Sequence, residues 1–230
     1  MAKSKKSTQE TSKGLENIES SLSKAESYIE RNQNKLLYIV GGIVLIVAIY
    51  LGYQKYVVEP HIEESKEVHF VAQQYFASDS FALALNGDGT NLGWLAINEE
   101  YGSTPIGELS NYYVGICYLQ LGNYEEAISY LEKFDTEDPI LGPLAKGNIG
   151  NAHAELGDLD QALSFYLEAV NMNDNKYTTP MFMLKAALIY ELQGNNAEAL
   201  KLYETVSGKY SLTPFRQTSD KYMAKLKAEV

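Results

Sequence analysis

Three histidines are the side chains of this sequence best suited to bind a transition metal, and they are His61, His69 and His153. His61 and His69 are spaced so that they share one face of a helix, but no third ligand stands at a useful spacing from them. His153 occupies a position that aromatic side chains fill in two similar segments of the chain, which favours packing. The sequence therefore predicts no metal site and no cofactor.

A second candidate for chemistry is the segment Asn86–Thr90, Asn-Gly-Asp-Gly-Thr, which resembles the beginning of a calcium-binding loop. Such a loop requires glycine at its sixth position and glutamate at its twelfth. Here these positions hold Asn91 and Ile97. The segment is therefore predicted to be a surface turn.

The sequence contains no recognisable set of residues for nucleophilic catalysis. The single cysteine, Cys117, lies in an apolar helical run and is predicted to be a small buried side chain. No phosphate-binding loop, nucleophile elbow or catalytic cysteine–histidine signature occurs. The sequence therefore predicts a protein that is not an enzyme and takes no small-molecule substrate.

The charge of the chain is distributed unevenly along its length. Residues 1–56 carry eight basic and five acidic side chains, whereas residues 57–230 carry 11 basic and 25 acidic ones, a balance of −14. An acidic domain repels the phosphates of nucleic acids, so nucleic-acid binding is disfavoured. The mildly basic N-terminal part suits anionic lipid headgroups instead.

One pattern occurs three times, around turn glycines that are 35 and 37 residues apart. A small residue stands seven residues before each glycine, and an alanine stands five residues after it. Two antiparallel helices joined by a tight turn approach closely, which requires small residues where they cross. No such pair buries its apolar face alone, so several pairs must stack. The turn glycines are Gly122, Gly157 and Gly194, the small residues Gly115, Gly150 and Ala187, and the alanines Ala127, Ala162 and Ala199.

Prolines at a matching period mark the predicted helix starts. Threonine precedes three of the four prolines, and this pair is typical of an N-cap followed by proline at the first helical position. The pairs are Thr104–Pro105, Thr179–Pro180 and Thr213–Pro214, and the remaining proline is Pro143.

The three segments resemble tetratricopeptide repeats, and the resemblance covers roughly residues 105–210. It implies an all-α fold, a right-handed α-solenoid with three repeats in residues 105–212. A degenerate helix pair is expected before them in residues 59–104, with Trp94, Leu95 and Tyr101 packing inward. A C-terminal cap helix is expected in residues 213–230.

An uncharged run of 18 residues, from Leu36 to Tyr53, precedes the repeats. A helix of this length spans about 27 Å, close to the hydrocarbon thickness of a bilayer. With Val57 and Val58 extending it, the run predicts a transmembrane helix over residues 36–58. A cleaved signal peptide fits poorly, because the 35 preceding residues are too many and no small-x-small cleavage site follows.

Basic residues on the two sides of this span predict its orientation. Seven stand in residues 1–35 and two in residues 54–73, which favours a cytoplasmic N-terminus and a periplasmic repeat domain. A stripe of apolar residues at helical spacing also predicts a short amphipathic helix within the cytoplasmic tail, residues 1–35. The stripe consists of Leu15, Ile18, Leu22, Ala25 and Ile29.

A basic tail, one N-terminal span, a degenerate helix pair and about three repeats together resemble the ancillary subunit of the bacterial Sec translocon. This resemblance implies a membrane-anchored protein-binding adaptor of the bacterial inner membrane. Its partners would be translocon subunits, an envelope chaperone or an exported polypeptide, so that it links protein export to the periplasm. Two alternatives stay open, a structural scaffold for cell-envelope assembly or division, and a cytosol-facing import receptor of opposite orientation.

In tetratricopeptide repeats, fixed positions of the first helix of each repeat line a concave face. Carried onto this chain, they predict an apolar protein-binding groove with an acidic fringe, which suits an apolar or basic-amphipathic segment. The basic set with which some relatives hold a peptide's terminal carboxylate is absent, and only Asn151 has a suitable type. The same residues are equally compatible with a core that the protein's own terminal helices cover. The predicted groove residues are Leu109, Tyr112, Ile116, Leu119, Leu144, Asn151, Met181, Leu184, Leu188 and Glu191.

Overall fold

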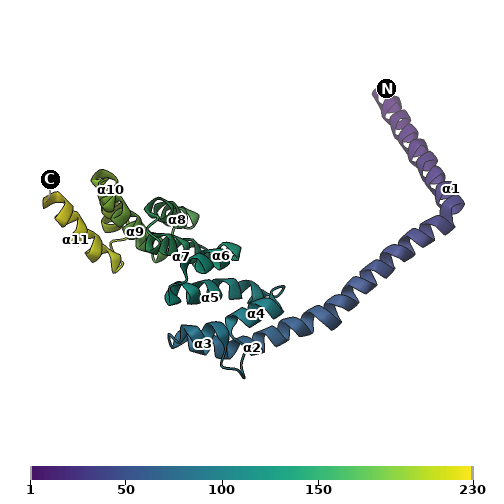
Figure 1. Ribbon diagram of the computed structural model, residues 1–230. Coiled ribbons are helices and arrows are strands. Elements are labelled where there is room, and N and C mark those ends of the chain that lie inside the picture. Colours follow the sequence, from purple (N-terminus) through teal and green to yellow (C-terminus); the bar gives the residue numbers. More distant parts are fainter. Residues whose placement is uncertain (1, 229–230) are drawn as a thin grey trace. The chain divides into compact units, whose positions relative to one another are not determined.

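The computed structural model describes residues 2–228, without the side chains of residues 2–21 and 25. Every element among these residues is a helix (Figure 1), which confirms the all-α prediction for the described part of the chain. The chain forms two compact units, Met1–Pro60 and His61–Val230.

The first unit consists of one long helix, α1 (Ala2–Tyr53), and a π-helical turn, η1 (Gln54–Val58). The helical segment Leu22–Ala77 contains an 18-residue window with a mean hydropathy of 2.4, of which no residue is buried. By length and composition alone, it is the one described segment that is long and apolar enough to cross a membrane.

The predicted amphipathic stripe lies within this helix, which begins well before the stripe does. The side chains of Leu15, Ile18 and Ala25 lie outside the described residues. Those of Leu22 and Ile29 are exposed. A short, separate helix in the tail is therefore replaced by a helix that continues into the apolar run.

The second unit opens with three helices where a pair was expected, α2 (Glu59–Ala77), α3 (Phe81–Asn86) and α4 (Trp94–Tyr101). Gly87 and Gly89 have positive φ angles of 81° and 87°, so the chain leaves the helix after Asn86. Asp88 accepts hydrogen bonds from the backbone N–H groups of Thr90 and Asn91, as a surface turn does.

Aromatic packing holds these three helices against the first repeat. Trp94 is fully buried and stacks on Tyr113, with ring centroids 4.2 Å apart. His61 stacks on Tyr101 at 4.8 Å, and the ring of His69 lies 6.0 Å from that of Trp94. The two histidines therefore act as packing side chains, and no group of residues that could hold a metal ion occurs among the described residues.

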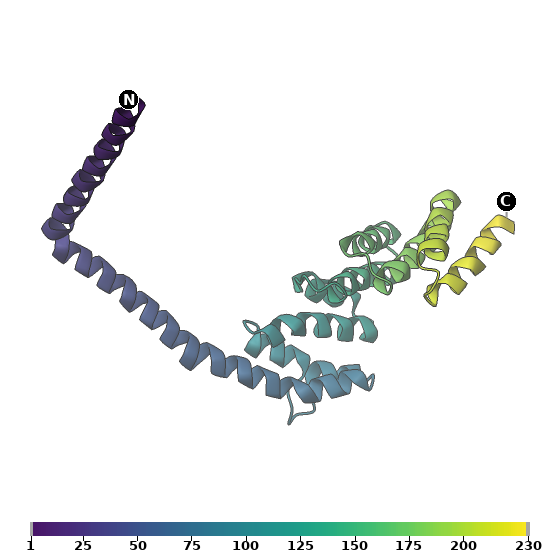
Figure 2. The same cartoon turned by 180° about the vertical axis from the view of Figure 1, so that it is seen from behind.

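Three helix pairs and a final helix complete the second unit. They follow one another in chain order in both views (Figures 1 and 2), as expected for an array of stacked repeats. The first two pairs are α5 (Pro105–Leu121) with α6 (Tyr124–Lys133), and α7 (Leu141–Glu155) with α8 (Leu159–Met172). The third is α9 (Thr178–Leu192) with α10 (Asn196–Lys209), and α11 (Phe215–Ala228) ends the array.

The glycine pattern behaves as the spacing predicted. The turn glycines Gly122, Gly157 and Gly194 have positive φ angles of 83°, 81° and 75°. A Cβ atom on Gly115 would lie 2.5 Å from Leu131 Cγ, and one on Gly150 would lie 2.8 Å from the ring of Tyr166. The helices of these pairs therefore approach closely where the small residues stand.

The prediction of threonine N-caps is correct only once. The Thr104 side chain accepts a hydrogen bond from the Gly107 N–H, 3.1 Å away, with Pro105 at the first helical position. Thr179 lies inside α9, and the Asn175 side chain instead accepts hydrogen bonds from the N–H group of Tyr177, just before the helix, and from that of Thr178, its first residue. Thr213 precedes α11 and donates its hydroxyl to the Tyr210 carbonyl oxygen.

The final helix α11 covers the end of the third repeat, as a cap does. Its Leu226 is buried, and its Tyr222 stacks on Tyr203 with ring centroids 5.6 Å apart. The hydroxyl of its buried Ser219 donates a hydrogen bond to the Tyr203 carbonyl oxygen.

Candidate functional site

Four of the ten predicted groove residues line two pockets. All four residues lie on the first helices of their repeats. Leu119 and Asn151 line a pocket of about 550 Å³, here called the central pocket. Leu188 and Glu191 line a second one of about 530 Å³, the C-terminal pocket. The central pocket is completed by Gln120, Tyr124, Asn148, Ala154, Glu155, Tyr166 and Lys185, and the C-terminal pocket by Leu192, Gly194, Asn196, Tyr222, Lys225 and Leu226.

The other six predicted residues pack between neighbouring helix pairs. Ile116 and Leu184 are only 8% exposed, so their side chains belong to the cores on either side of their helices. They differ from the expected groove positions because each helix also contacts the next pair in the stack. Leu109 and Tyr112 are half-buried against the core around Ile116, and Leu144 and Met181 are half-buried against the core around Phe182.

A chain of hydrogen bonds fixes the side chains on the wall of the central pocket. The Tyr166 hydroxyl donates to Asn151 Oδ1 at 2.9 Å, and Asn151 Nδ2 donates to Asn148 Oδ1 at 2.8 Å. Asn148 Nδ2 in turn donates to the Leu144 carbonyl oxygen at 2.8 Å. Burial, with a smaller contribution from Glu155, raises the pKa of Tyr166 to about 12, so its hydroxyl stays a donor at neutral pH.

Lys185 of α9 completes this wall, although the repeat register did not predict it. Its side chain is half-buried, and its Nζ atom lies 5.8 Å from the centroid of the Tyr166 ring. Burial lowers the pKa of Lys185, while the charge of Glu155 acts in the opposite direction. Lys185 and Glu191 are the two charged residues of the otherwise largely apolar helix α9. A lone lysine in such a helix is the sequence feature that could have identified Lys185 as a pocket residue.

The C-terminal pocket is partly filled by contacts that α11 makes. Glu191 Oε1 accepts a hydrogen bond from the Tyr203 hydroxyl, and Glu191 Oε2 lies 3.5 Å from Lys225 Nζ. Burial first, and the hydrogen bond to Glu191 second, raise the pKa of the Tyr203 phenol. This acid of the predicted fringe is therefore already paired within the protein.

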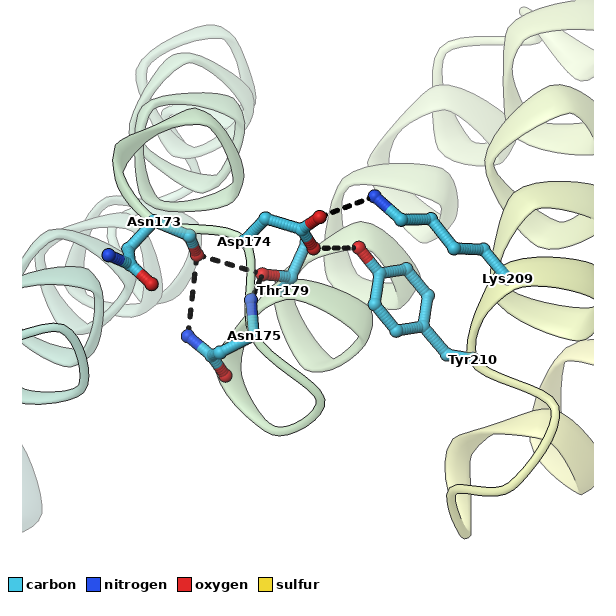
Figure 3. A network of polar contacts seen from close by, with 6 residues as sticks. All are labelled: Asn173, Asp174, Asn175, Thr179, Lys209 and Tyr210. Atoms are coloured by element: carbon cyan, nitrogen blue, oxygen red, sulfur yellow. Dashed lines mark hydrogen bonds and ion pairs between the residues drawn. The ribbon is translucent and has the colours of Figure 1, made fainter.

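A polar network ties the loop after α8 to the end of α10 (Figure 3). Asp174 Oδ2 lies 2.6 Å from Lys209 Nζ, and Asp174 Oδ1 accepts a hydrogen bond from the Tyr210 hydroxyl. Thr179 Oγ1 donates to the Asn173 carbonyl oxygen at 3.0 Å, which holds the loop against the start of α9. The network fixes the second repeat to the third outside the pockets.

Replacing Asp174 by asparagine is expected to lower the Tm of the repeats at neutral pH. The hydrogen bond from Lys209, followed by that from Tyr210, lowers the pKa of Asp174 below its ordinary value. A lowered folded-state pKa stabilises the protein above the unfolded pKa, and this stabilisation is lost as pH falls through the folded pKa. The Tm of the full chain and the Tm of D174N, measured by circular dichroism in detergent, should therefore differ at neutral pH and become equal as the pH is lowered. Asp135→Asn, at an exposed side chain, is the control, and a constant difference at every pH would contradict the electrostatic assignment.

Two family models match the repeat region, and both describe tetratricopeptide repeats. They match residues 111–140 and residues 148–211. No curated protein matches the chain significantly.

Solved structures with the same fold include two crystal structures of nearly identical TPR-like repeats from Podosopora anserina, described as a kinesin light chain. The first, of a variant with one substitution, has a TM-score of 0.58 at 16% sequence identity, and covers 72% of this chain and 86% of that one. The second has a TM-score of 0.56 at 16% identity, with 70% and 84% covered. At this identity the similarity shows the fold alone. Residues 111–140 and 148–211 of this chain therefore match tetratricopeptide repeats, within an all-helical array that has the fold of the TPR-like solenoids.

Proposed function

We propose that this protein is a non-enzymatic adaptor that is anchored in a membrane and binds another polypeptide on the face of its repeats. The observation that carries the proposal is the presence, in one chain, of an unburied apolar helix and a tetratricopeptide array with an open polar pocket. Tetratricopeptide repeats present extended surfaces that bind protein partners. The apolar helix suits lipid, since exposing it to water is unfavourable by about 25 cal/mol for each Å² of apolar surface.

The order of these parts supports a more specific role beside the Sec translocon of the bacterial inner membrane. Seven basic residues stand before the span, in residues 1–35, and two stand after it, in residues 54–73, which favours a cytoplasmic N-terminus and periplasmic repeats. In this arrangement the repeats receive an envelope chaperone or an exported polypeptide. The span holds them beside the translocon subunits.

Two lysines in the apolar run should release the protein from the membrane. Val44 and Val47 are exposed in α1, so lysine at both positions leaves the fold of the repeats untouched. Each charge near the middle of a span costs about 2.5–3.5 kcal/mol of insertion. We expect the unaltered chain in the membrane fraction after an alkaline wash, and V44K/V47K in the soluble fraction. The control is Q73K/Q74K, which places two lysines at exposed positions of α2. If V44K/V47K and Q73K/Q74K partition equally between membrane and soluble fractions, the apolar run is not an anchor.

Site-specific photo-crosslinking in cells tests the adaptor role directly. A photoreactive residue at Leu188 stands in the C-terminal pocket, and one at Asn151 stands in the central pocket. Glu132, exposed on α6 and outside both pockets, is the control position. Capture of a defined polypeptide from the pockets and not from Glu132 supports the proposal. Capture of nothing from either pocket would remove it.

A structural scaffold for cell-envelope assembly or division is the second candidate function. Identification of the captured proteins by mass spectrometry separates the two, since translocon components should dominate only for the adaptor. A reporter fused after Val230 that is active only in the cytoplasm would replace the periplasmic orientation by that of a cytosol-facing import receptor.

A further inference from the structure

Lys185 is a partly buried cation that makes no ion pair at contact distance with a described residue, although the charge of Glu155 acts on it from a longer distance. No carboxylate oxygen of these residues lies within 4.0 Å of its Nζ atom, and no hydrogen bond from that atom occurs. Lys146, a lysine of comparable exposure on α7, is by contrast paired with Glu168 at 3.0 Å. Taking a charge partly out of water without a hydrogen-bonded counter-ion is unfavourable, so a lysine in this position is suited to a carboxylate from outside the chain that approaches it directly.

The amides beside Lys185 offer further hydrogen-bond donors to such a counter-ion. The side-chain amide of Asn151 uses one of its two N–H groups for Asn148, and that of Asn148 uses one for the Leu144 carbonyl oxygen. Each amide therefore keeps a second N–H group. The hydrogen bond from Tyr166 fixes the orientation of Asn151, while the ring of the same Tyr166 lies under Lys185. A carboxylate, which only accepts hydrogen bonds, matches one ammonium and two amide donors.

Glu155 limits how much negative charge the central pocket can receive. It lines the same pocket, and its Oε2 atom lies 3.5 Å from the Tyr124 hydroxyl. With Lys185 and Glu155 together the pocket is close to neutral, and the region from residue 57 onward carries a balance of −14. A polypeptide with many acidic residues is therefore repelled at long range, whereas a single carboxylate still finds a cation at short range.

We propose that the central pocket binds one acidic side chain of the partner, within a segment that is otherwise apolar or basic, with Lys185 as the counter-ion. This proposal rests on the adaptor function, because it assigns a recognition element to the same face. Lys185 selects the acid, and Asn148 and Asn151 orient its carboxylate. The partner is thereby defined by the position of one acidic residue rather than by its overall charge.

The test is selection of peptides from a random displayed library on the full-length protein in detergent micelles. Selections run in parallel on the unaltered protein, on Lys185→Met and on the control Lys221→Met, an exposed lysine of α11 outside both pockets. We expect peptides from the unaltered protein and from K221M to share aspartate or glutamate at one position, and those from K185M to lack this preference. For the best peptide, we expect K185M to weaken binding by roughly tenfold or more.

Replacing the acid of that peptide by its amide gives a second measurement, which needs no altered protein. We expect a similar loss of affinity on the unaltered protein and little further loss on K185M, because the two substitutions remove the same contact. Peptides that bind tightly without a preferred acidic position would overturn this inference and leave the adaptor function standing. Failure to select any binding peptide on the unaltered protein would overturn both.

Discussion

Replacing Trp94 by alanine lowers the free energy of unfolding of the second unit by about 3–5 kcal/mol, the usual cost of removing a large buried aromatic side chain. Trp94 is fully buried, stacks on Tyr113 of α5 and faces His69 of α2. It therefore joins the three opening helices to the first repeat. Because the ring is large and contacted from two helices, the remaining side chains cannot close the cavity.

Urea unfolding of the full chain in detergent, followed by circular dichroism, measures this loss. Trp94→Phe is the matched control, because Nε1 of Trp94 is the one buried side-chain polar atom without a hydrogen-bond partner among the described residues. Phenylalanine then loses volume but no hydrogen bond, and it keeps an aromatic face for Tyr113. We expect it to cost clearly less than alanine. Equal losses for the two variants would show that the volume that only an indole fills, and not the aromatic face toward Tyr113, stabilises the packing.

The parts of the fold that follow from local spacing were predictable from the sequence. The turn glycines need a positive φ angle, and Gly115 and Gly150 stand where a side chain would collide with the partner helix. Both requirements depend on residues within one helix pair. The same holds for the Asn86–Thr90 turn, whose Asp88 binds the backbone a few residues further on.

The parts that depend on neighbouring pairs were not predictable in this way. The first N–H group of α9 is bound by Asn175 and not by a threonine cap, because the loop at Asp174 is fixed by Lys209 and Tyr210 of the next repeat. Likewise Ile116 and Leu184 are buried in clusters that join their own helix pair to the next helix of the stack, α7 for Ile116 and α11 for Leu184, although their position in the repeat is that of a groove residue. A register alone specifies a face of one helix, whereas burial depends on what the stack places against it.

Lys185 was missed for the same reason. It stands one residue away from a predicted groove position, Leu184, and a helix turns by about 100° between neighbouring residues. Leu184 points into the core with Tyr203, whereas Lys185 points toward Tyr166 of the preceding repeat. The wall of the central pocket therefore receives from α9 the residue that follows a predicted groove position.

Replacing Gly147 by alanine should destabilise the second unit although alanine is the better helix former. Gly147 of α7 faces Phe182 of α9, and a Cβ atom there would lie 1.9 Å from the ring. Phe182 is 1% exposed and its ring stacks against that of Tyr166 at 6.0 Å, so it has no free space to move into. Overpacking of this kind costs about 1–3 kcal/mol or more, against a gain of about 0.5–1 kcal/mol from helix propensity.

Gly208→Ala measures the gain in helix propensity without overpacking. Gly208 lies in α10 and is exposed, and a methyl group added there would meet no heavy atom within 4 Å apart from its neighbours and backbone in the same helix turn, so alanine should stabilise the protein slightly. Combining Gly147→Ala with Phe182→Leu should recover part of the loss, because the smaller side chain makes room for the methyl group. If G147A proved as stable as G208A, α7 and α9 would have to be free to separate.

The same substitution connects packing to binding, because Gly147 sets the distance between the two helices that form the wall of the central pocket. Asn148 and Asn151 stand on α7 and Lys185 on α9, so a methyl group between these helices moves the amides away from the ammonium. We expect G147A to weaken the binding of an acidic peptide, and G147A/F182L to restore part of it, in a fluorescence titration of the full chain. If the peptide affinity falls in G147A and partly recovers in G147A/F182L, as the stability does, the pocket depends on the spacing of the two helices. Unchanged affinity in G147A would instead place the acid's contacts on one helix alone.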